Sequence, residues 1–354
     1  MNTPMIDIEA LIRPNIRALK PYRSARQDYL TGVLLDANEN AFGSAIAFDG
    51  LELNRYPDPF QTALRSRLAQ LHGITREQLF VGVGSDEVID LLLRIFCEPQ
   101  KDSILILEPT YGMYRVAADV NDVTVDSCLL TDDFQLDVTA AKQCMNEKTK
   151  VIFCCSPNNP TGNLLNRSGI LSLCAQTSAI VVVDEAYADF AETESLTTAI
   201  ERFPNLVVLR TLSKAWGLAA IRLGYAVAHP LIVSYLLKVK SPYNINILTS
   251  TEALKALASA EHVRRSVTLV AQERQRLAKE LASFRFVRCV YPSDANFLLV
   301  RCVDARSLYQ RLAERGIIVR DRSSEPKLEN CLRISVGTPE QNDVLLNALK
   351  ELDL

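Results

Sequence analysis

Short apolar runs alternate with helical patterns between about residues 62 and 230. The segment after Gly84 repeats apolar residues at helical spacing, and Ser85 is its expected N-cap. The runs between the helical segments are rich in β-branched and aliphatic side chains and predict strands at 79–83, 103–107, 123–128, 151–155, 180–183, 206–209 and 224–228. Strands that are apolar on both faces and separated by helices are typical of parallel sheets covered on both sides. We therefore predict an α/β fold with a mostly parallel, seven-stranded sheet and helices on both faces.

The pattern changes after about residue 242. A long helical stretch at 248–284 has a predicted break near Ser259. Apolar or alternating runs then predict strands at 297–301, 316–319 and 332–336. A last helix follows Thr338, which forms a capping box with Gln341. This tail predicts a second, smaller α+β domain.

Three parts of the chain follow from these patterns. Residues 1–45 have few periodic apolar positions and predict an extended arm, which must dock on another surface to be ordered. We expect this arm to dock on the small domain and on a partner subunit. The large domain is expected at 46–245 and the small domain at 246–354.

Composition narrows the possible functions. The 354 residues carry 39 Lys and Arg against 42 Asp and Glu, for a formal net charge of −3, and the basic residues are scattered. This distribution argues against nucleic-acid binding and against a polybasic membrane patch. Nine cysteines without a CxxC pair and three well-separated histidines argue against a disulfide framework, a metal site and a Ser-His-Asp triad. No apolar leader or membrane-spanning stretch is present, so we expect a cytoplasmic protein that acts on small molecules.

Four of the predicted strands end in residues that can do chemistry, at the edge where open α/β sheets bind ligands. Ser85 and Asp86 begin a helix whose backbone N–H groups can hold a phosphate, although the same residues suit an ordinary helix start. Asn159 lies in a stiff turn that can aim it at a ligand, or in a plain loop. Asp184 follows a buried strand. It is either a helix cap or a buried carboxylate that requires a cation. Lys214 is either a surface charge or an amine made nucleophilic by apolar surroundings.

Taken together, these strand ends match one cofactor. Pyridoxal 5′-phosphate requires an amine for a Schiff base, a partner for its pyridinium nitrogen and a phosphate site. Lys214, Asp184 and the helix start at Ser85, each of which follows a predicted strand, can supply all three. The combination is more specific than any one of them.

Five motifs in this order, followed by Arg222, resemble fold-type I pyridoxal-phosphate aminotransferases. They are GSDE at 84–87, PTYGMY at 109–114, NNPTG at 158–162, DEAY at 184–187 and TLSK at 211–214. Three flanking segments are similar to histidinol-phosphate aminotransferases, enzymes of L-histidine biosynthesis. These are PYRSAR at 21–26, NRYP at 54–57 and LRISVG at 332–337.

The resemblance implies a role at the cofactor ring for five side chains. Lys214 carries the cofactor as a Schiff base and later acts as the general base. Asp184 pairs with the pyridinium nitrogen, and Asn159 and Tyr187 bind the 3′-oxygen. Tyr111 stacks on the ring face.

The same resemblance assigns the phosphate end of the cofactor. Backbone groups of Ser85 and Asp86, together with Ser213 and Arg222, hold the phosphate. Tyr56 reaches the phosphate bound to the neighbouring subunit. The resemblance therefore implies a homodimer whose two active sites lie at the subunit interface.

Substrate binding is expected from the small domain. Alternation along the strand at 332–336 places Arg333 on the face opposite its apolar neighbours, and Arg320 follows the preceding strand. Paired guanidinium groups suit an anion, although two plain surface arginines would show the same pattern. By resemblance, Arg333 binds the phosphate of histidinol phosphate or a carboxylate of glutamate or 2-oxoglutarate, assisted by Arg320 and Tyr22.

Several alternatives remain open. A threonine-phosphate decarboxylase, or an aromatic or other amino-acid aminotransferase, shares the fold and the cofactor site. A pyridoxal-phosphate-binding regulator usually carries a DNA-binding domain, and the first 45 residues leave little room for one. A nicotinamide-dependent oxidoreductase is disfavoured because Glu87 replaces the third glycine of its fingerprint motif.

Overall fold

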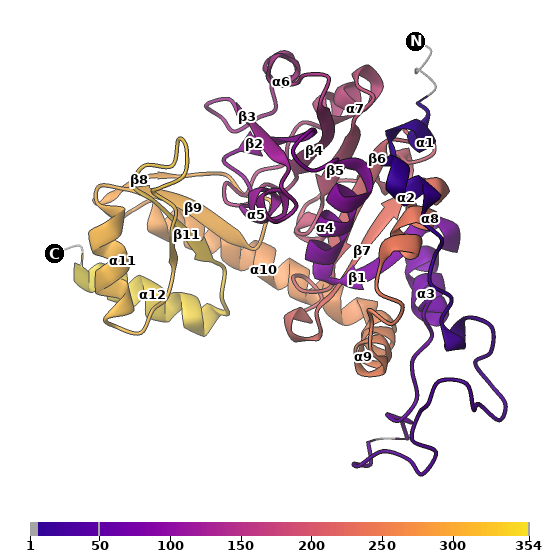
Figure 1. The fold of residues 1–354 in the computed structure, drawn as a ribbon. Coiled ribbons are helices and arrows are strands. Elements are labelled where there is room, and N and C mark those ends of the chain that lie inside the picture. Colours follow the sequence, from indigo (N-terminus) through magenta and orange to yellow (C-terminus); the bar gives the residue numbers. More distant parts are fainter. Residues whose placement is uncertain (1–5, 49, 353–354) are drawn as a thin grey trace.

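The computed structural model describes residues 6–48 and 50–352, which fold around two β-sheets (Figure 1). The large sheet has seven strands in the order β1-β7-β6-β5-β4-β2-β3. Its strands are β1 (Leu79–Val83), β2 (Ser103–Glu108), β3 (Thr124–Leu129), β4 (Thr149–Cys155), β5 (Ile180–Asp184), β6 (Leu206–Thr211) and β7 (Leu223–Ala228). All seven predicted strands are present, and the prediction of a mostly parallel sheet is confirmed.

The single antiparallel strand of this sheet is β7, which pairs antiparallel with both β1 and β6. The pairs β2 with β3, β2 with β4, β4 with β5 and β5 with β6 are parallel. The carboxyl ends of these parallel strands therefore lie at one edge, where Asp184 is the last residue of β5.

Helices cover both faces of the large sheet, as predicted. On one face α3 (Thr62–His72), α6 (Val138–Cys144), α7 (Arg167–Gln176) and α9 (Ile247–Leu257) pack into a single apolar core with the sheet. On the other face lie α4 (Gly84–Phe96), α5 (Met113–Val120) and α8 (Pro230–Val239). Short 3-10 turns lie at Arg76–Gln78, Ala188–Phe190, Leu196–Ala199 and Ala219–Ile221. Because both faces are covered, the central strands are buried on both sides, and adjacent Cys154 and Cys155, for example, are both buried. The edge strand β3 differs, since most of its residues are partly or fully exposed.

The small sheet has four strands in the order β10-β11-β9-β8. They are β8 (Val287–Val290), β9 (Phe297–Cys302), β10 (Arg320–Asp321) and β11 (Cys331–Ser335), and all neighbouring pairs are antiparallel. The strand predicted at 316–319 is wrong, because those residues form the connection out of α11 (Ala305–Ala313) and only Arg320 and Asp321 pair with β11. Sequence patterns also missed β8, whose side chains are partly or fully exposed and show no apolar run.

The helix α10 (Ala260–Leu281) runs from the region of the large sheet to the small one (Figure 1). It begins after Ser259, where the sequence predicted the break between two helices. The C-terminal helix α12 (Pro339–Leu352) starts with the predicted capping box, in which the backbone N–H of Gln341 donates to Thr338 Oγ1. The boundaries predicted at residues 45 and 245 remain predictions.

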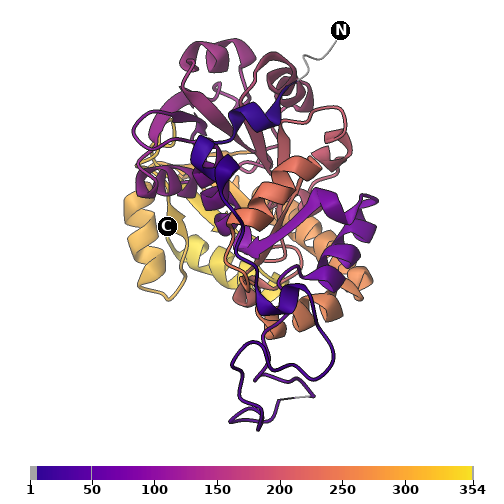
Figure 2. The ribbon, with the colours of Figure 1, turned by 45° about the vertical axis from the view of Figure 1, so that its right-hand side comes forward.

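The N-terminal arm begins against helices of the large sheet and then extends away from both sheets (Figure 1). Its two short helices, α1 (Ile8–Leu11) and α2 (Pro14–Ala18), pack beside α8 and α4, where Arg13 pairs with Glu98 at 3.2 Å. Beyond them and a 3-10 turn at Ala25–Gln27, the chain forms an irregular loop that projects away from both sheets (Figures 1 and 2). The described part of the arm thus lies on the large-sheet side, and its docking on a small domain remains a prediction.

Candidate active site

The strand ends that carry chemically capable residues meet in one pocket at the carboxyl edge of the large sheet. All the residues predicted to bind the cofactor line it, except Tyr56. The complete lining is Gly84, Ser85, Asp86, Tyr111, Cys155, Asn159, Asp184, Ala186, Tyr187, Thr211, Ser213, Lys214 and Arg222. Segments far apart in the chain contribute, because neighbouring strands bring them to one sheet edge.

The start of α4 forms one end of the pocket. The helix begins at Gly84 with Val83 as its N-cap, so the prediction of Ser85 as the N-cap is wrong. The carboxylate of Glu87 turns back and accepts the Val83 N–H at 2.5 Å, so this acid points away from the pocket. Gly84 has a φ of +71°, and a Cβ there would lie 2.8 Å from Arg222 Nη2. Backbone N–H groups of the first turn, at the positive end of the helix dipole, thus lie beside a guanidinium.

Asp86 is the one carboxylate of this turn that lines the pocket. Its Oδ2 lies 3.3 Å from Arg222 Nη2, and its Oδ1 accepts a hydrogen bond from Tyr111 Oη at 3.2 Å. Both contacts offset the negative charge that would otherwise repel an anion. Burial and the nearby Asp86 charge both raise the pKa of Tyr111, so this hydroxyl stays protonated as a donor.

Asp184 lies at the base of the pocket and is only 3% exposed. Burial raises its pKa to about 6, and two hydrogen bonds oppose that rise. Tyr114 Oη donates to its Oδ2 at 2.8 Å, and the backbone N–H of Ala186 donates to its Oδ1 at 3.1 Å. A cation in contact with a carboxylate buried in this way stabilises it strongly.

Tyr114 is a site residue that sequence reasoning missed. Its side chain is fully buried and stacks on Phe153 with ring centroids 4.5 Å apart. The tyrosine closes the PTYGMY motif, but its partner Asp184 is 70 residues away. Only the folded sheet brings the two side chains together, and the motif alone carries no signal of that contact.

Lys214 lies in the open part of the pocket and is more exposed than the sequence suggested. Its pKa is lowered, first because the surrounding protein displaces water and second because Arg333 is close by. Its Nζ lies 5.4 Å from the centre of the Tyr187 ring. The Tyr187 ring is itself packed edge-on against Phe297 of β9, with centroids 5.1 Å apart. The lysine therefore lies between the large and small sheets.

Arg333 joins the site from the small sheet. Its Nη1 donates to Asn159 Oδ1, and its guanidinium lies 5.3 Å from the centre of the Phe297 ring. Alternation along β11 is as predicted, since Arg333 is half-buried opposite the buried Leu332 and Ile334. This contact uses the amide oxygen of Asn159 and not its Nδ2 group.

The second predicted arginine, Arg320, is exposed and pairs with Arg333 across β10 and β11. A further arginine, Arg322, was missed by sequence reasoning. Its charge acts on both Arg333 and Tyr187, and its guanidinium pairs with Glu325. Three cationic side chains therefore lie together beside the pocket: Arg320 and Arg322 in and just after β10, and Arg333 in β11.

Four predicted site residues are not among those that line the pocket. Arg320 and Arg333 lie on the small sheet beside it, and the other two, Tyr22 and Tyr56, lie on the arm side. Tyr22 is 75% exposed and lies along a groove on α8. Tyr56 is 50% exposed and stacks on Tyr243, with ring centroids 4.5 Å apart. Both are on the arm side, so the roles assigned to them require another subunit and remain predictions.

Metal binding and membrane spanning can both be assessed over residues 6–48 and 50–352. Within these ranges, no three His, Cys, Asp or Glu side chains are grouped in a way that could hold a metal ion. Within the same ranges, none of the helices combines the length and apolar character needed to cross a membrane.

Comparison with known proteins assigns the family. The model of the family "aminotransferase class I and II" matches residues 24–349. The chain belongs to the class I and II aminotransferases. The sequence resemblance to fold-type I aminotransferases is thereby confirmed, and so is the prediction of an enzyme.

Curated relatives of this aminotransferase carry a more specific name. The histidinol-phosphate aminotransferase of Parabacteroides distasonis is 49% identical over 352 residues, which cover 99% of this chain and 100% of the relative. That of Cytophaga hutchinsonii is 48% identical over 345 residues, covering 97% and 98%. The resemblance to histidinol-phosphate aminotransferases is thus confirmed over the full length.

Solved structures share the fold of this aminotransferase. The histidinol-phosphate aminotransferase of Clostridium acetobutylicum has a TM-score of 0.79 at 24% identity, over 85% of this chain and 91% of that one. The enzyme of the same name from Sinorhizobium meliloti, solved in complex with pyridoxal 5′-phosphate, has a TM-score of 0.78 at 23% identity, over 85% and 84%. The L-threonine-O-3-phosphate decarboxylase of Porphyromonas gingivalis has a TM-score of 0.71 at 25% identity, over 85% and 91%.

Proposed function

We propose that this chain transfers an amino group between histidinol phosphate and 2-oxoglutarate, giving imidazole acetol phosphate and glutamate, as a step of L-histidine biosynthesis. The observation that carries the proposal is a single pocket that combines the Lys214 amine, the buried Asp184 acid and the start of α4. The curated relatives at 48 and 49% identity support the choice of substrate. They favour it over the decarboxylase, which is matched at 25% identity.

The residues of the pocket fit pyridoxal 5′-phosphate. Gly84 has no side chain where a Cβ would meet Arg222, so the backbone of the first turn is open to a phosphate. Arg222 adds a guanidinium there, and Ser213 lines the same pocket. When bound, the cofactor would supply a carbonyl that bonds to amines and a ring that takes up electrons from the substrate carbon.

Lys214 is the group that would bond the cofactor and move the proton. Its Nζ must be neutral both to attack a carbonyl and to take a proton from the amine-bearing carbon of the substrate. Because its pKa is lowered, a larger fraction of Nζ is neutral near pH 7 than for an ordinary lysine.

Asp184 would hold the ring nitrogen. As a buried carboxylate it would accept a hydrogen bond from a protonated nitrogen and stabilise its positive charge. The hydrogen bond from Tyr114 favours the charged form of Asp184. Asn159 and Tyr187 line the same pocket and would bind the 3′-oxygen, while Tyr111 would cover the ring face.

Arg333 orients the substrates. Its guanidinium is anchored by Asn159 and by the face of Phe297, so it can bind a phosphate or a carboxylate with little loss of side-chain freedom. Arg320, which lies opposite on β10, would assist it, as would Tyr22 from the arm of a second copy of the chain.

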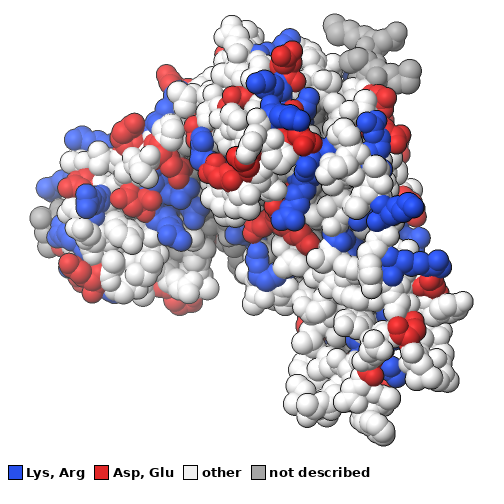
Figure 3. Space-filling model, in the orientation of Figure 1, with Lys and Arg blue, Asp and Glu red and all other residues white. Residues whose placement is uncertain are grey.

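A homodimer completes this site. The loop of the arm exposes many large apolar side chains, including Val33, Leu35 and Phe42 at 91, 83 and 101% exposure. Figure 3 shows this region as mostly uncharged surface at the lower right, whereas positive and negative side chains are mixed over the rest of that face. Surfaces of this kind mark interfaces. We infer that the arm packs on a second copy of the chain and that Tyr56 reaches its phosphate site.

We also infer a cytoplasmic location, in keeping with nine free cysteines.

The proposed activity is tested with purified protein, histidinol phosphate and 2-oxoglutarate. We expect glutamate to form, and each half-reaction to run separately when one substrate is supplied alone. Phosphothreonine should release no carbon dioxide. A protein that makes no glutamate but releases carbon dioxide from phosphothreonine would be the decarboxylase instead.

A further inference from the structure

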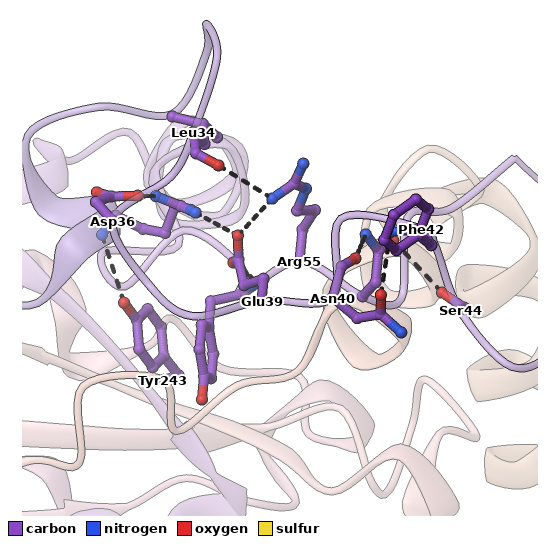
Figure 4. Close-up of polar contacts among 11 residues, drawn as sticks. Leu34, Asp36, Glu39, Asn40, Phe42, Ser44, Arg55 and Tyr243 are labelled. Carbon is purple, nitrogen blue, oxygen red and sulfur yellow. Dashed lines mark hydrogen bonds and ion pairs between the residues drawn. The ribbon is translucent and has the colours of Figure 1, made fainter.

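The projecting arm contains a buried cluster of charges. Glu39 lies at its centre and accepts hydrogen bonds from two guanidinium groups through Oε2, from Arg26 Nη2 and from Arg55 Nη1 at 2.8 Å (Figure 4). Arg26 also pairs with Asp36 through its other terminal nitrogen. The side chains of Arg26 and Glu39 are only 2% and 3% exposed.

Burial of this kind is unusual in such a segment. Within residues 28–48 and 50–61, the chain forms no helix or strand, and most of its side chains are exposed. Removing a carboxylate and a guanidinium from water is costly unless they pair closely. Burial alone would raise the pKa of the Glu39 carboxyl, but its hydrogen bonds outweigh that effect and lower the pKa to about 2, so the group is charged throughout the physiological range. The cluster therefore fixes the course of a segment that has few other restraints.

The other oxygen of Glu39 holds Tyr56. Glu39 Oε1 accepts the backbone N–H of Tyr56 at 2.7 Å. The Tyr56 ring then stacks on Tyr243, whose hydroxyl in turn accepts the backbone N–H of Arg26 at 3.4 Å. Three parts of the chain, around residues 26, 39 and 56, are thus joined to one another and to the loop that follows α8.

We propose that Glu39 is a positioning residue for Tyr56: held by Arg26 and Arg55, its carboxylate fixes the Tyr56 backbone so that this tyrosine is preset for a second copy of the chain. One part of this inference rests on the proposed function, namely that Tyr56 binds at the phosphate site of that copy. The fixing of Tyr56 within its own chain does not depend on it.

The first test uses trypsin on the full-length protein, because trypsin cleaves after Arg55 at the Arg55–Tyr56 bond. The variant Glu39→Gln keeps the shape of the side chain but replaces one of its two oxygens with an NH₂ donor. This donor then faces either the two guanidinium groups or the Tyr56 N–H, which are themselves donors. We expect cleavage at Arg55–Tyr56 to become at least about fivefold faster, because local opening exposes the bond. Cleavage after the exposed Arg23 should keep its rate.

A matched control comes from the same arm. Asp28 pairs with Arg23 at 2.9 Å, but the two side chains are 39% and 75% exposed and make no contact with Tyr56. Asp28→Asn should leave cleavage at Arg55–Tyr56 unchanged. Equal cleavage at that bond in wild-type protein and Glu39→Gln would overturn the proposal, and so would an equal increase in Asp28→Asn.

The second test measures the affinity of the protein for pyridoxal 5′-phosphate. Glu39→Gln and Tyr56→Phe should each weaken binding, by up to about tenfold for loss of one hydrogen bond to the phosphate. The double variant should bind no more weakly than Tyr56→Phe, because both changes remove the same contact. Additive losses would overturn the proposal. An unchanged affinity in Tyr56→Phe would instead contradict the role of Tyr56 in the partner's site, and the trypsin result would still decide whether Glu39 fixes it.

Discussion

At the scale of single residues, Asp184 shows how the site balances opposing effects. Burial favours the neutral acid and raises its pKa to about 6, whereas Tyr114 and the Ala186 N–H favour the carboxylate. At pH 7 the group is therefore ionised in most molecules. It becomes protonated as the pH falls through about 6, and it then loses the charge that holds a protonated ring nitrogen.

Replacing Tyr114 with Phe should shift this balance. The variant Tyr114→Phe keeps the stack on Phe153 but removes the hydrogen bond, so the pKa of Asp184 rises further. We expect the acid limb of the pH profile of kcat/KM to move to higher pH and activity at pH 6 to fall by about tenfold. Tyr291→Phe is a matched control, because its hydroxyl bonds Arg301 outside the pocket at 3.0 Å. A profile unchanged in Tyr114→Phe would contradict this balance of effects.

The two arginines of the small sheet should differ in their effect. Arg333→Ala should raise KM for both histidinol phosphate and 2-oxoglutarate, by about tenfold or more, because a charged hydrogen-bonding partner is lost. Arg320→Ala should have a smaller effect because its side chain is exposed. Steady-state kinetics with each substrate varied in turn measures both. An effect of Arg320→Ala larger than that of Arg333→Ala would reverse the assignment.

The sequence predicted which residues line the pocket better than it predicted how they contact one another. Asp184 stands out because a charged residue directly after an apolar run requires an explanation. Lys214 stands out because it lies between a buried strand and an apolar stretch of small residues. Tyr114 did not stand out, because its partner Asp184 comes from another segment. Arg322 did not stand out either, because Arg333 and Tyr187, on which its charge acts, come from other segments. A tyrosine in an amphipathic helix gives the same sequence pattern whether its hydroxyl donates a hydrogen bond to a carboxylate or to water.

At the scale of elements, the contact between α4 and β7 sets the phosphate end of the pocket. Gly224 in β7 faces the start of α4, and a Cβ there would lie 2.1 Å from the Ser85 nitrogen. The Gly84 N–H also donates to the Arg222 carbonyl at 2.9 Å, just before β7 begins. The helix start can approach the strand this closely only because residue 224 has no side chain.

Gly224→Ala tests this close approach. The added methyl must push α4 away from β7, so we expect the free energy of unfolding to fall by about 1–3 kcal/mol. Affinity for pyridoxal 5′-phosphate should fall as well. Gly112→Ala is the control, since nothing lies within 4 Å of its Cβ position and its φ is −63°. Urea unfolding compares the two, and equal stabilities would contradict the close packing of α4 on β7.

Elements were predicted where their pattern is long and apolar. The seven strands of the large sheet were predicted, but the antiparallel direction of β7 was not. Its direction depends on the course of the connection at 212–222 and not on the strand's own residues. The two-residue strand β10 is too short to show any alternation. Its place is set by pairing with β11.

At the scale of the whole molecule, the arm carries the observations that support the proposed homodimer. Its exposed apolar side chains and the position of Tyr56 outside the pocket both point to a second subunit. The arm lies away from the small sheet of its own chain (Figure 1). The surface on which the arm docks has no signal in the sequence, because in the proposed homodimer that surface belongs in part to the partner subunit.

Mixed dimers test this arrangement. Lys214→Ala removes the reacting amine from its own site, and Tyr56→Phe weakens the site of the partner. A dimer with one copy of each variant contains one site with both Lys214 and Tyr56 intact. At low cofactor concentration, mixing the variants should therefore give more transaminase activity than the sum of the two separate preparations. Activity equal to that sum would show that Tyr56 does not act across subunits.

The proposed function requires that Lys214 bond pyridoxal 5′-phosphate. Borohydride reduction of the purified protein with the cofactor, followed by peptide mass spectrometry, measures this most directly. Lys240 is an internal comparison, because burial lowers its pKa to about 8 but its Nζ donates to the Pro242 and Ser241 carbonyls at 2.7 and 3.0 Å. We predict a phosphopyridoxyl group on Lys214, none on Lys240 and none in Lys214→Ala. A label on another lysine, or no label in the wild-type protein, would contradict the claim.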